Sequence, residues 1–209
     1  VRAAITDGSE VNAKGDVALS AKDEAGFIIP TWMIDEGVQE DLNSALEDSP
    51  IDLKSSILAI NVSVAGSGEK AVGVALMGNV VTNDITAEIS GSTVRAGVDS
   101  FGTVISPDSD LSLDAYSKAG ILAVTVGVGA SGDLAIQATG FGNVITNSTK
   151  AGITSNSGVE AAHDVYVNAE DDSSIRSLGL SIAASGSNAI GAIIGANVIT
   201  YSVTAEVSG

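Results

Sequence analysis

Between residues 57 and 82 the chain alternates large apolar residues with small or polar ones. The apolar positions are Leu58, Ile60, Val62 and Val64, followed by Val72, Val74 and Leu76. A period of two predicts β-strands, because successive side chains of a strand point to opposite faces. Gly66-Ser67-Gly68 separates the two runs, and Ser131-Gly132 and Ser185-Gly186 occupy the same place in later runs, so we expect turns at all three.

A motif of five residues occurs three times along the chain. Asn-Val-Val-Thr-Asn begins at Asn79, Asn-Val-Ile-Thr-Asn at Asn143 and Asn-Val-Ile-Thr-Tyr at Asn197. An Ala-x-Ile or Ala-x-Val signal follows each copy, and the chain also opens inside such a unit. The equivalent alanines are Ala3, Ala87, Ala151 and Ala205, which are separated by 84, 64 and 54 residues. Self-similarity of this kind is typical of repeat architectures.

The unequal spacing predicts insertions between otherwise equivalent copies. If the shortest spacing is the bare repeat, the second interval carries a short insertion at 98–109 and the first a longer one at 27–54. Loops absorb insertions, whereas a stacked core does not. Because the chain starts and stops inside a repeat, we expect residues 1–209 to be a single unit cut from a longer array.

Many short strands separated by Gly, Ser and Asn are typical of an all-β solenoid, a barrel or a sandwich. Internal repetition selects the β-solenoid. With about 18 to 20 residues per coil, the chain would form a parallel β-helix of about 8–10 coils. Since stacked strands lie about 4.8 Å apart, the rod would be roughly 40 to 50 Å long.

The insertion at 27–54 departs from the strand pattern. Val38, Leu42 and Leu46 follow a helical spacing, with acidic residues before them and Pro50 after them. The segment Phe27–Ile34 concentrates apolar residues and includes the single tryptophan, Trp32. Two interpretations stay open: this cluster packs the helix against the rod, or it is an exposed epitope that anchors a partner.

Composition limits the partners and the core. Hydrophobic residues make up 44% of the 209 residues but aromatic residues only 3%, so the core must consist of Val, Ile, Leu and Ala. The net charge of −17 argues against nucleic acid and against an anionic membrane as partners. Cysteine is missing, which excludes disulfides and thiol chemistry. No apolar run reaches the roughly 18 residues of a membrane helix, so we expect no membrane insertion.

Candidate chemistry is sparse. The single histidine, His163, lies beside Asp164 at a predicted turn, and no serine has the context of a catalytic triad. Glu170-Asp171-Asp172 could bind calcium weakly, although a solvated loop is the simpler interpretation. Gly127–Gly132 matches Gly-x-Gly-x-x-Gly but lies at a turn. We therefore predict no enzyme, and no catalytic, cofactor-binding or metal-binding residue.

The face opposite the large apolar residues carries very small side chains. Its members are Ala71, Gly73 and Ala75, then Ala123, Thr125, Gly127 and Gly129, then Gly179, Ser181 and Ala183. If the apolar face is buried, these residues form a flat outer strip. The strip would pack against the insertion, a neighbouring rod or another surface, or it would simply be solvated.

The order of these motifs resembles the repeated passenger regions of large bacterial filamentous adhesins, of the autotransporter, filamentous-haemagglutinin and leukotoxin-like kinds. In each copy Asn-x-[Ile/Val]-Thr-Asn precedes Ala-x-Ile-x-x-Ser-x-Val-x-Ala, then Asp-[Val/Leu]-x-[Val/Leu]-x-Ala, then an apolar run broken by Ser-Gly. The resemblance implies a right-handed parallel β-helix that is exported to the cell surface and serves as a rod or stalk. It implies as partner a receptor or glycan on a host or neighbouring cell.

Two other functions remain open at this stage. A self-assembling extracellular filament would associate through its coil ends or through the small-residue strip. A carbohydrate-active β-helix enzyme would need a groove with clustered acids and an arginine, whereas Arg2, Arg95 and Arg176 occupy different places in their repeats.

Overall fold

The computed structural model describes residues 1–24 and 55–209. Over these residues the chain is all-β, as predicted, with thirteen strands and no helix. The predicted helical insertion 27–54, with Trp32, lies outside the described residues. The strands are β1 (Arg2–Ile5), β2 (Glu10–Ala13), β3 (Val17–Glu24), β4 (Ile57–Ser67), β5 (Lys70–Ser90), β6 (Thr93–Ala96), β7 (Leu111–Lys118), β8 (Gly120–Ser131), β9 (Leu134–Thr154), β10 (Gly158–Ala161), β11 (Val165–Asp171), β12 (Ser174–Ser185) and β13 (Asn188–Val207).

The strands form four parallel sheets in which each strand pairs with its counterparts in the neighbouring repeats. The sheet orders are β1-β5-β9-β13, β10-β6-β2, β11-β7-β3 and β12-β8-β4. Ala3 pairs with Ala87, Ala87 with Ala151, and Ala151 with Ala205. The alignment of repeats found in the sequence is therefore the hydrogen-bonding register of the sheets.

The predicted size and number of coils were wrong. One pass through all four sheets takes a whole repeat, not 18 to 20 residues, so the chain makes three passes and begins a fourth. Such a stack is only about 15 Å thick, rather than 40 to 50 Å. Alternation identifies strands but does not say which of them pair. Here the successive strands of one repeat lie in different sheets.

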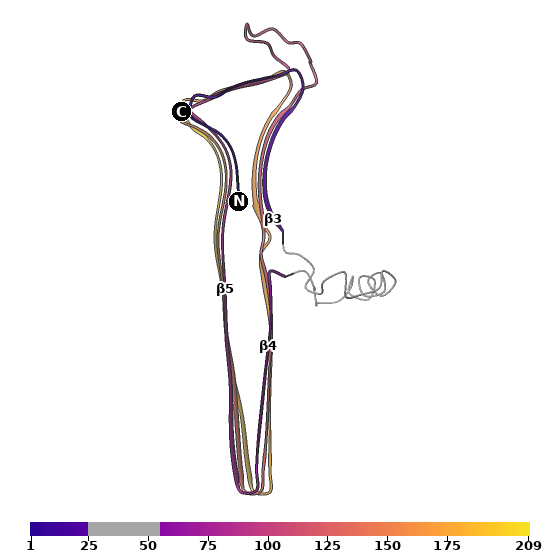
Figure 1. Cartoon of the computed structure of the whole chain (residues 1–209), viewed down its shortest axis with the longest axis vertical. Coiled ribbons are helices and arrows are strands. Elements are labelled where there is room, and N and C mark those ends of the chain that lie inside the picture. The colour runs from indigo at the N-terminus through magenta and orange to yellow at the C-terminus, as the bar shows by residue number, and fades with distance from the viewer. Residues whose placement is uncertain (25–54) are drawn as a thin grey trace, which may run out of the picture.

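Viewed along the stack, the layers superimpose on an outline with two parts (Figure 1). The head is triangular, and its three sides are β2-β6-β10, β3-β7-β11 and the C-terminal part of β1-β5-β9-β13. The blade is long and flat, and comprises residues 57–83, 120–147 and 174–201. Its two sheets are β4-β8-β12 and the N-terminal part of β5-β9-β13, joined at the tip by the predicted Ser-Gly turns.

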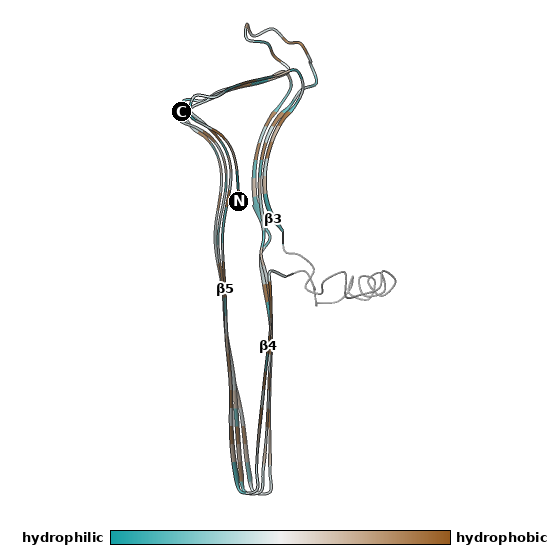
Figure 2. Cartoon of the chain, viewed as in Figure 1, coloured by the Kyte–Doolittle hydropathy of each residue, from teal (hydrophilic) through white to brown (hydrophobic). Residues whose placement is uncertain are grey.

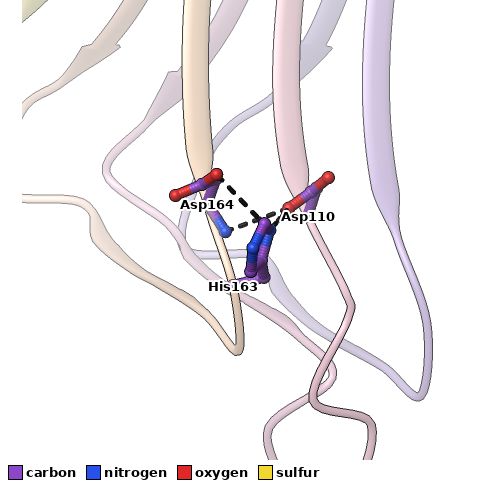
Figure 3. Close-up of side chains that lie close together, drawn as sticks. All are labelled: Asp110, His163 and Asp164. Atoms are coloured by element: carbon purple, nitrogen blue, oxygen red, sulfur yellow. Dashed lines mark hydrogen bonds and ion pairs between the residues drawn. The ribbon is translucent and has the colours of Figure 1, made fainter.

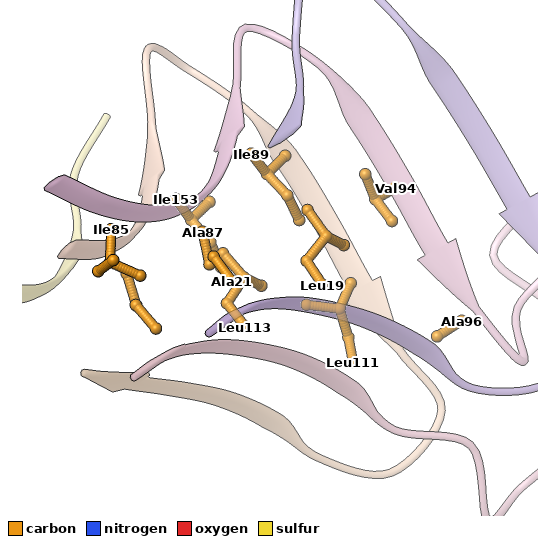
Figure 4. Close-up of a cluster of buried hydrophobic side chains, with 12 residues drawn as sticks. Leu19, Ala21, Ile85, Ala87, Ile89, Val94, Ala96, Leu111, Leu113 and Ile153 are labelled. Carbon is orange, nitrogen blue, oxygen red and sulfur yellow. The ribbon is translucent and has the colours of Figure 1, made fainter. Parts of the chain in front are cut away.

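The head has a conventional apolar core (Figure 4). Ile85 and Ile89 of β5 and Leu111 and Leu113 of β7 are among its fully buried side chains. Along each wall, alanines alternate with these larger residues among the inward-facing positions. Their small side chains let the three walls pack within a small triangle. Truncating one of these isoleucines or leucines to alanine would cost about 2–5 kcal/mol.

The blade has the reverse of the predicted orientation. Its small residues face inward: Ala71, Ala75, Ala123 and Ala135 are buried between the two sheets. Toward the tip its large apolar residues face outward, and Val64 is 77% exposed and Leu76 73%, whereas Ile121 and Ile145 nearer the head are buried between the sheets. In Figure 2 apolar residues, in brown, recur along both sides of the blade. The predicted outer strip of small residues is therefore internal, and it is not available for association.

Glycines inside the blade accommodate larger side chains of adjacent layers. A Cβ at Gly73 would overlap the amide of Gln137, its partner in the next layer. A Cβ at Gly195 would overlap the ring of Phe141, again its register partner. Because one layer supplies the large side chain and the neighbouring layer the glycine, the two sheets lie close together over the whole stack.

Residues 98–109 lie in the connection from β6 to β7, which projects from one corner of the head (Figure 1). The equivalent connections in the other layers, 14–16 and 162–164, are short. An antiparallel bridge joins Val98 to Val104, and the carboxylate of Asp99 accepts hydrogen bonds from the backbone N–H groups of Phe101 and Thr103. The loop is thus held by hydrogen bonds among its own residues.

Candidate functional site

The repeated asparagines form a ladder inside the blade. Asn79 donates from Nδ2 to Oδ1 of Asn143 at 2.7 Å, and Asn143 donates to Oδ1 of Asn197 at 2.9 Å. Asn143 is 1% exposed, and it also donates to Oγ of Ser177 across the interior. Buried amides need such partners. The first asparagine of the motif therefore helps to hold adjacent layers in register.

The second asparagine of the motif connects the β1-β5-β9-β13 sheet to the facing β3-β7-β11 sheet. Asn83 donates to Oδ2 of Asp23 at 2.6 Å, and Asn147 donates to Oδ2 of Asp171 at 2.9 Å and to Oγ of Ser173 at 2.8 Å. The third copy has Tyr201 at this position, which is exposed. The repetition of the motif signalled its importance, but only the fold shows that its role is internal.

A cluster of three titratable side chains lies at a corner of the head (Figure 3). Nδ1 of His163 lies 2.8 Å from Oδ1 of Asp110 and 3.4 Å from Oδ2 of Asp164. His163 is exposed at the turn from β10 to β11, as predicted. Asp110 belongs to the preceding layer, and the sequence analysis did not connect it with His163.

A backbone pattern places these aspartates. Asp16, Asp110 and Asp164 each immediately precede a strand of the β3-β7-β11 sheet. The carboxylate of Asp16 accepts a hydrogen bond from the N–H of Asp110, and that of Asp110 accepts one from the N–H of Asp164, both at 3.0 Å. The aspartate that opens the repeated Asp-[Val/Leu]-x-[Val/Leu] motif was the signal that could have identified this stack.

The cluster perturbs the proton affinities of its members. The hydrogen bond to Asp110, followed by the charges of Asp164 and Asp110, raises the pKa of His163. The same hydrogen bond, together with that from the backbone of Asp164, lowers the pKa of Asp110. The pair is therefore stabilised as imidazolium and carboxylate.

One imidazole nitrogen and two carboxylate oxygens can also serve as metal ligands. These atoms lie within 4.8 Å of one another, and this is the one such group found among the described residues. Zinc accepts such donors. A metal ion would, however, have to displace the hydrogen bond between His163 and Asp110, and all three side chains are in contact with solvent.

The acidic run Glu170-Asp171-Asp172 does not gather into a comparable group. Asp171 accepts hydrogen bonds from Asn147 and from the backbone of Ser173, and Asp172 forms an ion pair with Lys118 at 3.2 Å. These contacts hold the carboxylates apart in separate structural roles.

A polar hollow at the start of the stack resembles the groove that an enzyme would require. It has a volume of about 480 Å³, and its lining includes Arg2, Asp7 and Glu88. Arg2 forms an ion pair with Glu88, so one of the two acids is engaged by the one arginine of the hollow. Asp7 lies at a corner with a left-handed backbone, with φ of 63°. Asp7, the second acid of the hollow, accepts a hydrogen bond from the hydroxyl of Thr6 at 2.8 Å.

Arg95 is also committed to structure. On the outer surface of β6 it forms ion pairs with Glu10 at 3.1 Å and with Glu160 at 3.3 Å, one from the layer on each side. It therefore links three layers rather than contributing to a pocket.

No helix in the described part of the chain is long and apolar enough to cross a membrane. Comparisons with protein-family models, with curated proteins and with solved structures found no match to this chain. The resemblance to filamentous adhesins consequently rests on the sequence motifs.

Proposed function

We propose that this chain is a rod or stalk segment of a secreted or surface-anchored bacterial adhesin, built as a right-handed β-solenoid with one repeat per coil. The single observation that carries the proposal is the register. Ala3, Ala87, Ala151 and Ala205 stack in one sheet, so each new repeat adds a layer with the same contacts as the last. A structure that grows by identical layers is suited to spanning distance.

The polar ladders support the same role. Asn79, Asn143 and Asn197 join layer to layer inside the blade, and Arg95 bridges three layers outside the head. Both features resist sliding of one layer over another, which is what a stalk under load requires. The partners that we propose for the assembled adhesin are a receptor or a glycan on a host or neighbouring cell.

Lengthening the stack tests the rod. We expect a variant with twelve further copies of residues 150–203, inserted after residue 203, to fold and to gain roughly 60 Å in length by negative-stain imaging. A matched variant with the same inserted residues in scrambled order should not form the longer particle. Unfolding of the first variant, or a compact particle, would contradict the proposal.

Attachment is tested separately. Beads coated with the chain and beads coated with albumin would be counted on cultured animal cells and on immobilised glycans. Greater retention of the chain-coated beads is expected if this segment contributes to binding. Equal retention would restrict its role to that of a spacer.

A self-assembling filament is the second candidate, because the outer layers present open strand edges. Within the described residues, β4 pairs with β8 alone and β12 with β8 alone. Unpaired N–H and C=O groups along such edges can accept another layer. Growth of the unmodified chain into longer rods as its concentration rises would favour this function over a passive stalk.

A further inference from the structure

The outer surface of the blade is apolar on both sides. On the side formed by β5, β9 and β13, the exposed fractions of the large apolar side chains extend to 78% at Ile194. The other strongly exposed members on this side are Val72, Val74, Leu76, Val80, Ile190 and Val198. Monomeric soluble proteins seldom leave contiguous apolar patches larger than a few hundred Å². A surface of this kind therefore calls for a partner.

The size of this surface fits a protein interface. Seven large aliphatic side chains exposed to this degree present on the order of 800 Å² of apolar surface, part of it toward the open ends of the stack, and an interface of standard size takes about 800 Å² from each partner. Apolar residues recur along most of the length of the blade (Figure 2). One face of one copy is therefore close to the size that a stable dimer needs.

The distribution of charge permits two blades to approach each other. The blade contains four charged residues, namely Glu69, Lys70, Asp133 and Arg176, whereas the whole chain carries a net charge of −17. Three of the four lie at the tip, and the acidic excess lies elsewhere. Two copies that meet through their blades would therefore avoid most of the like-charge repulsion.

The β5-β9-β13 side also has a shaped recess, lined by Leu76, Ala138, Gly140, Ala192 and Ile194 among others. Gly140 is the register partner of Leu76 and of Ile194, so a glycine lies between two projecting side chains of adjacent layers. The volume of the recess is about 350 Å³, enough to receive an aliphatic side chain. In a symmetric dimer, the projecting side chains of one copy can enter the recess of the other copy.

We propose that the β5-β9-β13 face of the blade is a self-association surface on which a second copy of this chain docks, with its apolar ridge entering the recess over Gly140.

The test is sedimentation velocity on the full chain over a wide concentration range. The wild-type chain should pass from monomer to dimer as its concentration rises. Ile194→Glu should weaken the dimer roughly tenfold or more, because it places a charge at the edge of the recess. The control is Val64→Glu on the opposite face, where the exposed fraction, 77%, is nearly the same, and it should leave the dimer constant unchanged.

A second variant tests the recess itself. A Cβ at Gly140 would meet the flexible end of the Leu76 side chain at 2.8 Å, so Gly140→Val should be tolerated by the fold. It adds apolar surface but fills the recess. We expect weaker dimerisation with an unchanged circular dichroism spectrum, whereas association by non-specific hydrophobicity would be unchanged or stronger.

Three results would overturn this proposal. One is a wild-type chain that is monomeric at every concentration. Another is equal weakening by Ile194→Glu and Val64→Glu. The third is binding to neutral phosphatidylcholine vesicles that Ile194→Glu abolishes, since this would identify lipid as the occupant. Addition of copies at the ends of the stack would also raise the sedimenting mass, so the lateral contact is identified by the difference between the Ile194→Glu and Val64→Glu variants and by Gly140→Val.

Discussion

The side-chain amide of Asn79 donates a hydrogen bond of 2.7 Å to the amide oxygen of Asn143, although 64 residues separate them along the chain. The two residues open successive copies of the same motif and are register partners in adjacent strands. Asn143 repeats the contact with Asn197. Long-range order in this fold therefore comes from equivalent positions meeting in space.

Asn143→Ala should destabilise the chain by about 2–4 kcal/mol, because it removes a buried hub and leaves neighbouring polar groups unpaired. Thermal or urea unfolding measures the loss. The matched control is Asn79→Ala at the end of the ladder, where one bond is lost from a half-buried residue and about 1 kcal/mol is expected. Equal losses at both positions would contradict a central role for Asn143.

Gly195→Ala should cost about 1–3 kcal/mol, since the new methyl group would overlap the ring of Phe141. The nearby Gly142→Ala is the control, because a Cβ there has no atom within 4 Å, and its effect should stay within about 0.5 kcal/mol. Combining Gly195→Ala with Phe141→Leu should recover part of the loss in a double-mutant cycle. Additive effects would show that the two residues do not share space.

Gln137→Met should stabilise the chain by about 1–3 kcal/mol. Gln137 is fully buried, and among the described residues neither end of its amide has a hydrogen-bond partner. An unbranched thioether of similar length removes the unpaired polar atoms and keeps the side chain in the space beside Gly73. A lower unfolding midpoint for the variant would mean that the amide is satisfied in solution.

The ion pair between His163 and Asp110 should make stability depend on pH. Because the folded chain raises the pKa of His163, this contribution is complete below the ordinary value near 6.5 and is lost as the pH rises through the folded pKa. Because the pKa of Asp110 is lowered, its contribution is present above the ordinary value near 3.9 and is lost as the pH falls through the folded pKa.

Proton NMR can follow this titration without assignment, since the chain has one histidine. The wild-type imidazole should titrate above pH 6.5, and Asp110→Asn should move the pKa of His163 downward. Identical titration curves for the two proteins would show that the pair does not form in solution.

The pattern along the chain was enough to predict the strands and the turns, but not which strands pair. Alternation identified the runs around Val62 and Val74, glycines marked the tip, and the spacing of Ala3, Ala87, Ala151 and Ala205 equals the strand pairing. These features are local or repeated, so they can be found along the chain without knowing its path. The aspartate before each strand of the β3-β7-β11 sheet was equally visible, although its link to His163 was not.

The size of a layer and the direction in which each face points depend on how the sheets pack against one another. A period of two separates the two faces of a strand but does not say which face is internal. In the head the space between the walls accepts Ile85 and Leu113, so the large side chains point inward. Toward the tip of the blade the two sheets lie too close for that, so Gly73 and Ala75 point inward and Val74 and Leu76 face outward.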